Sequence, residues 1–151
     1  MALKDSFITF EKRSVPVSPN YRILFKIALI LLILYKNSRG RKSSILRLQF
    51  FIWALKSDEN QLKFKILINQ NGDTSNIWSL DPTVIRALNF AKAENLIEFE
   101  NGGVILTNKG AEFINSIIKS ESLTKENEFL SSIGLLVTEQ LIKKLSKSWA
   151  K

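Results

Sequence analysis

The stretch NLIEFENGGVILTNKG, residues 95–110, carries the clearest fold signal in this chain of 151 residues. Two short runs, Leu96 to Glu100 and Val104 to Leu106, flank a Gly-Gly pair, and this spacing predicts two strands joined by a tight turn. Thr107 follows as the expected cap of a helix, because its hydroxyl can accept from a free backbone N–H. The stretch therefore predicts a β-hairpin followed directly by a helix.

The residues before the hairpin predict four helices. Asp81-Pro82 is a cap followed by a first-turn proline, and the apolar residues after it recur at helical spacing. The expected helices run from Asn20 to Lys36, from a cap at Ser43 or Ser44 to about Lys56, from a cap at Ser57 or Asp58 to about Gln70, and from Pro82 to Glu94.

The two ends of the chain complete the predicted architecture. Phe7 to Phe10 predicts a short strand, and prolines extend the chain through residue 19. One last helix is expected from about Thr124, with an apolar stripe along its length. The prediction is a mainly α fold with a small β-hairpin: a winged helix-turn-helix with extra N- and C-terminal helices. Its parts are an extended arm (1–19), a winged-helix domain (20–120) and a C-terminal helix (121–151).

The net charge is +8, but it is unevenly distributed. Residues 1–56 carry eleven basic and two acidic side chains, whereas residues 57–151 carry eleven basic and twelve acidic ones. A basic chain favours an anionic partner. Here that preference belongs to the first third of the chain.

The expected recognition helix, Pro82 to Glu94, is electrically balanced. Arg86 and Asn89 lie three apart and could read base edges, but Asp81 and Glu94 offset the charges of Arg86 and Lys92. Nonspecific affinity for DNA comes mainly from surplus positive charge. We therefore favour ordinary solvated positions for Arg86 and Asn89.

The hairpin carries Glu98 and Glu100 and no basic residue between Leu96 and Leu106. The two glutamates point to one side of the strand and would repel phosphates. Pairing with a basic protein surface and a plain solvated face are both open readings.

Positive charge gathers instead in the basic segment, residues 36–47. A serine-capped helix start beside these cations could hold a phosphate, and a solvated loop is the alternative. The candidate contacts to nucleic acid or phosphate are Lys36, Arg39, Arg41, Lys42 and Arg47.

Two of the expected helices are apolar on nearly all sides. They contain ILFKIALILLILY and LQFFIWAL, and such helices must be covered completely. Either the chain wraps them itself, or surplus apolar surface forms an interface. We call the predicted hairpin the wing, and its two glutamates are candidates for such an interface. The candidate partner-interface residues are Phe51, Trp53, Glu98, Glu100, Leu141 and Trp149.

Several classes of function are disfavoured by composition. The chain has no histidine and no cysteine, so it lacks His general bases and thiolate chemistry. We expect no enzyme activity, no cofactor and no metal site. The longest apolar run, Ile27 to Tyr35, is shorter than the roughly 20 residues of a membrane span. No secretory signal is apparent, so we expect a cytoplasmic protein with no membrane contact.

Two segments together resemble a known family. RKSSILRLQFFIWALKS and LDPTVIRALNFAKAENLIEFENGGVILTNKGAEFI are similar to landmarks of the middle-component proteins of bacterial ABC-three-component systems and their Lamassu-type relatives. The resemblance covers roughly residues 20–118. Arg86, Thr107 and Lys109 match landmark positions.

The resemblance implies a small winged-helix accessory subunit in an anti-phage defence complex. Its partners would be an SMC-like ATPase, similar to those that tether chromosomes or repair breaks, and an effector such as a nuclease. The expected function is non-catalytic docking on these partners, with DNA backbone contacts as an added possibility. The alternative is a winged-helix transcription regulator that binds DNA.

Overall fold

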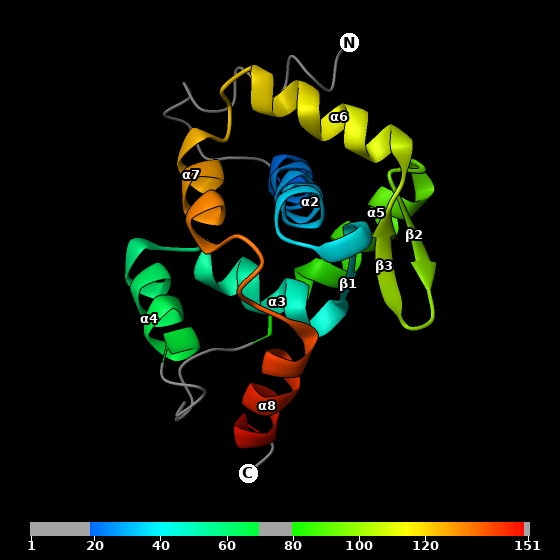
Figure 1. The fold of residues 1–151 in the computed structure, drawn as a ribbon. Helices are drawn as coiled ribbons and strands as arrows, with labels where there is room; N and C mark the ends of the chain where they lie inside the picture. Colours follow the sequence, from blue (N-terminus) through cyan, green and yellow to red (C-terminus); the bar gives the residue numbers. More distant parts are fainter. Residues whose placement is uncertain (1–18, 70–79, 150–151) are drawn as a thin grey trace.

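The computed structural model describes residues 19–69 and 80–149 (Figure 1). This part of the chain is mainly helical with one small sheet, which is compatible with a winged-helix-like class. The expected strand at Phe7 to Phe10 and most of the expected arm (1–19) lie outside the described residues. In chain order the elements are α2 (Pro19–Lys36), the 3-10 turn η1 (Arg39–Arg41), β1 (Lys42–Ser44), α3 (Ile45–Ala54), α4 (Asp58–Asn69), α5 (Thr83–Ala93), β2 (Ile97–Glu100), β3 (Gly103–Leu106), α6 (Asn108–Lys119), α7 (Thr124–Ile133) and α8 (Glu139–Trp149).

The sheet has three antiparallel strands in the order β1-β3-β2. The hairpin of β2 and β3 follows the sequence prediction, with Phe99 opposite Val104. The third strand, β1, is not predicted by the sequence pattern; it pairs with β3 so that Ser43 lies opposite Val104. Its three residues, Lys42 to Ser44, are all polar, so they lack the alternation of apolar and polar side chains that predicts a strand. The segment is extended because it pairs with the edge of β3.

Helix α2 is the centre of the molecule (Figure 1). Helices α3, α5, α6 and α7 all pack against it, and Ile30 to Leu34 are fully buried. A helix that is apolar on all sides is thus covered on all sides by its own chain. The reading in which the chain wraps its own core therefore holds for this helix.

The second apolar helix, α3, is also buried by its own chain. Phe51 is 0% exposed and Trp53 is 5% exposed, because α4 and α7 cover this side of the core. The ring of Phe64 lies 4.6 Å from that of Phe50 and 5.6 Å from that of Phe129, measured between centroids. Phe51 and Trp53 are core residues, so the expectation that they form a partner interface is wrong.

The C-terminal segment is two helices rather than the single one expected. Gly134 ends α7 with φ +57° and ψ −130°, a conformation that glycine adopts at little cost. The hydroxyl of Thr138 then accepts from the backbone N–H of Leu141 in the first turn of α8. The apolar spacing continues across the break, and for that reason periodicity alone predicted one helix. Leu141 is half-buried against the core, and the side chain of Trp149 lies outside the described residues.

The start of α6 is fastened to the end of α5. The Thr107 hydroxyl donates to the carbonyl of Asn95 (2.7 Å) and accepts from the N–H of Gly110, which confirms the predicted cap. Lys109 Nζ donates to the carbonyl of Glu94 at 2.9 Å. A Cβ on Gly110 would lie 2.1 Å from the Leu96 oxygen, so no larger residue fits there. Thr107 and Lys109 have structural roles in this fold.

Candidate interaction site

The basic segment presents fewer free cations than its sequence suggests. Lys36, Arg39 and Arg41 are exposed, and the Arg41 guanidinium lies over the Tyr35 ring at 5.6 Å. The ammonium group of Lys42 forms an ion pair with Glu100 on the wing, at 3.7 Å. Lys36, Arg39 and Arg41 form no ion pair with any described residue, so these three members of the segment can meet an external anion.

Arg47 points into the protein. It is 4% exposed, and its guanidinium donates to the carbonyls of Val137 and Asn37 and to the hydroxyls of Ser38 and Ser43. Burial lowers the pKa of Arg47, and the charge of Glu139 opposes that shift; an arginine remains protonated at neutral pH in either case. The expectation that Arg47 contacts phosphate is wrong, because this side chain ties the start of α3 to the segment before α8.

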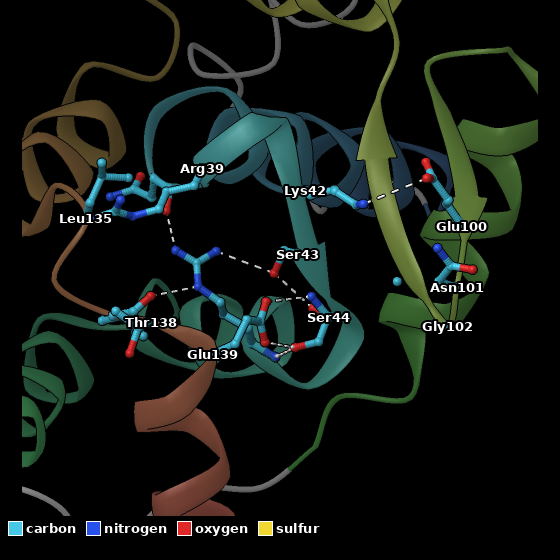
Figure 2. A pocket seen from close by; sticks show the side chains of 14 residues that line it. Arg39, Lys42, Ser43, Ser44, Glu100, Asn101, Gly102, Leu135, Thr138 and Glu139 are labelled. Carbon is cyan, nitrogen blue, oxygen red and sulfur yellow. Dashed lines mark hydrogen bonds and ion pairs between the residues drawn. The ribbon is translucent and has the colours of Figure 1, made fainter.

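The start of α3 binds a carboxylate of the protein itself, that of Glu139. The carboxylate of Glu139, the first residue of α8, accepts from the Ser44 N–H at 2.9 Å and from the Ser44 hydroxyl at 2.7 Å (Figure 2). Ser44 also caps α3 through the N–H of Arg47. The sequence identified a helix start that favours negative charge. In the structure, Glu139 occupies this helix start, so the position is not open to a phosphate.

A cavity of about 420 Å³ lies between the basic segment, the wing turn and the start of α8 (Figure 2). Its lining mixes the cations Arg39, Lys42 and Arg47 with the acids Glu100 and Glu139. Two of the three cations already have partners in the protein, as described above. The cavity therefore presents no concentrated charge of either sign.

The wing glutamates are paired with lysines of their own chain. Glu98 accepts from Lys92 of α5 at 2.8 Å, and Glu100 faces Lys42 of β1. All four side chains are between 42% and 49% exposed, so these are surface pairs that water screens strongly. The acidity of the wing is thus largely balanced within the molecule.

The outer face of α5 combines polar and apolar side chains. Arg86 and Asn89 are exposed, as a helix-turn-helix reading requires. Ile85 is 46% exposed and Phe90 is 52% exposed on the same outward side. Since Lys92 is paired with Glu98, Arg86 is the one cation of α5 without an ion pair among the described residues. This face offers little charge and two exposed apolar side chains.

A buried acid fixes the position of α5. The carboxylate of Asp81 pairs with Lys26 of α2 at 2.5 Å and caps α5 through the N–H of Thr83. The side chain of Gln49 bonds both backbone groups of Asp81, at 2.8 and 3.0 Å. Burial by itself raises the pKa of Asp81, but hydrogen bonds from Lys26 and Thr83 and the charge of Lys26 outweigh it, so the pKa lies well below its ordinary value. Asp81 is thus a charged anchor between α2, α3 and α5.

The described residues contain no group of three or more acidic side chains placed to bind a metal ion. Among the same residues, no helix combines the length and the apolar character that crossing a membrane requires. Comparison of the chain with protein-family models, with curated proteins and with solved structures found no match. In the described part of the chain, the candidate site has three parts: a weakly charged α5 face with exposed apolar side chains, an internally balanced wing, and three cations at residues 36–41 that form no ion pair.

Proposed function

We propose that this chain is a non-catalytic, winged-helix accessory subunit that docks on an SMC-like ATPase and an effector protein in an anti-phage defence complex. The partner classes come from the resemblance of residues 20–118 to middle-component proteins. The observation that carries the docking role is the outer face of α5, where Ile85 and Phe90 are about half exposed. Exposed apolar side chains at such a site favour contact with another protein.

Charge supports the same conclusion. A helix that enters the major groove is held by cations that neutralise phosphates around it. On α5 and the wing, Lys92 is neutralised by Glu98, and the two wing strands add only acids. The face consequently has Arg86 alone to offer the backbone. Burial of an aromatic ring such as Phe90 in a partner's pocket is the more favourable use of this surface.

DNA backbone contact enters the proposal as a secondary role of the basic segment. Lys36, Arg39 and Arg41 are exposed and lie away from acidic partners among the described residues. They would hold phosphates without reading sequence. In an assembled complex, such contacts would add to those of the ATPase.

The test is co-purification with the products of the neighbouring genes. A tagged chain is co-expressed with the adjacent ATPase and effector, and the complex is measured by size-exclusion chromatography. We expect Ile85→Asp and Phe90→Asp to abolish the complex, because each places a charge in an apolar contact. The matched control is Leu62→Asp on α4, where the side chain is 64% exposed and the complex should survive. A wild-type chain that elutes alone, or an α5 variant that still assembles, would contradict the proposal.

The rival function is a DNA-binding transcription regulator, favoured by the exposure of Arg86 and Asn89 one turn apart. It requires salt-sensitive binding to the promoter of its own gene, lost in Arg86→Ala and Asn89→Ala. Fluorescence anisotropy with promoter DNA and scrambled DNA distinguishes the two. We expect weak binding that ignores sequence and is lost when Lys36, Arg39 and Arg41 are changed to glutamine.

A further inference from the structure

A second hollow lies between α2 and the end of α3. Its volume is about 340 Å³, at the lower end of the range of about 300 to 1,000 Å³ for ligand pockets. One wall is a stripe of α2 with helical spacing, and the other is the last turn of α3. We call it the cationic groove; it is lined by Arg22, Phe25, Lys26, Leu29, Ile52, Leu55 and Lys56.

The floor of the groove is apolar. Leu29 is 4% exposed and Ile52 is 1% exposed, and both belong to the hydrophobic core. The apolar lining that a ligand can reach is that of Phe25 and Leu55, which are partly buried. These two side chains offer nothing to phosphates or sugars, but they favour an apolar side chain that excludes water.

The rim of the groove is positive. Arg22, Lys26 and Lys56 are its charged lining residues, and among the described residues the carboxylate that pairs with them is that of Asp81. This one acid lies 2.5 Å from Lys26 and 3.4 Å from Lys56, so it balances one of three positive charges. Arg22 is exposed and has no ion pair among the described residues. The unbalanced charge favours an anionic occupant.

We infer that the cationic groove binds an acidic peptide segment of a partner protein, which inserts one or two apolar side chains between α2 and α3. Carboxylates at either side of the inserted residue face Arg22 and Lys56, while the apolar group packs against Phe25 and Leu55. Complementary charge increases the rate and the specificity of association, and burial of the apolar side chain supplies most of the affinity. The inference rests on the proposed function only in taking the partner to be a protein.

The experiment uses fluorescein-labelled six-residue peptides and the full chain, followed by fluorescence anisotropy. The probe has a central Leu-Phe pair with two acidic residues on each side. A second peptide replaces Leu-Phe with Ser-Ser, and a third replaces the acids with lysines. We expect the probe alone to bind. Equal binding of the serine peptide would overturn the apolar part of the inference, and no binding of the probe at millimolar concentration would overturn all of it.

Variants assign the binding to the groove. The double variant Arg22→Gln, Lys56→Gln should weaken probe binding about tenfold. The matched control, Lys119→Gln with Lys144→Gln, removes the same charge from exposed positions on α6 and α8 and should leave binding within about twofold. Circular dichroism checks that both variants are folded. Lys26 is left intact because it holds Asp81.

Three further outcomes separate the possibilities. If duplex DNA binds and the Arg22, Lys56 double variant abolishes that binding while the acidic probe does not bind, the groove is a nucleic-acid site and the inference fails. If the probe fails to bind but the ATPase still co-purifies, only the groove inference is lost. If the probe binds but no partner co-purifies, only the proposed function is lost.

Discussion

The basic segment and the outer face of α5 differ in what each leaves at the surface. In the basic segment, the charged side chain of Arg47 is only 4% exposed, whereas on α5 the aromatic ring of Phe90 is 52% exposed. Arg47 is buried because four acceptors from three separate segments surround its guanidinium. Phe90 is exposed because α5 turns its other face to the core. The partners that a site supplies decide burial as much as residue type does.

Replacement of Arg47 by alanine gives the largest expected effect and tests the first half of this contrast. The change leaves the carbonyls of Val137 and Asn37 without their partner in the interior. We expect a loss of about 3 kcal/mol or more in the free energy of unfolding, measured by urea denaturation. Arg39→Ala is the control and should change stability by about 0.5 kcal/mol or less. Equal effects of the two variants would show that Arg47 is not bound inside.

Replacement of Asp81 by asparagine tests the ion pair and hydrogen bonds that position α5. We expect a loss of about 2 kcal/mol at neutral pH, because the ion pair with Lys26 disappears. Since the native pKa of Asp81 is lowered, its contribution is complete above the ordinary value of 3.8 and is lost as the pH falls through the native pKa.

The dependence of this stability loss on pH tests the lowered pKa of Asp81 directly. The stability difference between wild type and Asp81→Asn should be constant near neutrality and shrink below about pH 4. Urea denaturation at several pH values measures it. Asp58→Asn is the control, since that carboxylate is 78% exposed in its pair with Lys125. A difference that stays flat in acid would contradict the lowered pKa.

Replacement of Phe90 by serine gives the smallest expected effect on stability and tests the second half of the contrast. Because half of the ring is already in water, we expect a loss within about 1 kcal/mol. Phe64→Ala, at a fully buried ring, should cost about 3 kcal/mol or more in the same assay. If Phe90→Ser proved as destabilising as Phe64→Ala, the ring would belong to the core and not to a docking face.

Local signals in the sequence predicted most of the secondary structure. The caps at Ser44 and Thr107 depend on contacts between neighbours in the chain, and the structure confirms both. The hairpin is also confirmed, but its turn is Asn101-Gly102 instead of the expected Gly-Gly pair, because Gly103 already belongs to β3. The missed elements depend on distant residues. Strand β1 exists because β3 lies beside it, and the break at Gly134 was hidden because apolar spacing continues across it.

The candidate site was less predictable for the same reason. Charge counts identified the basic segment, but they could not show that Arg47 turns inward or that Glu139, 95 residues after Ser44, fills the start of α3. The exposure of Ile85 was also hidden, because this residue belongs to the apolar residues that recur at helical spacing in α5 and is nevertheless 46% exposed. The start of α5 was predictable, because the sequence Asp81-Pro82 is typical of the beginning of a helix.

The sequence by itself determined the helices up to α6 and the hairpin, because capping hydrogen bonds and apolar periodicity act over a few residues. It also determined that the central helix had to be enclosed, because ILFKIALILLILY has no polar face. The tertiary structure alone decided which charges meet: Arg47 with four acceptors, Asp81 with Lys26, and the wing glutamates with Lys92 and Lys42. Electrostatic partners are set by distance in space, and the chain order does not contain that distance until packing fixes it.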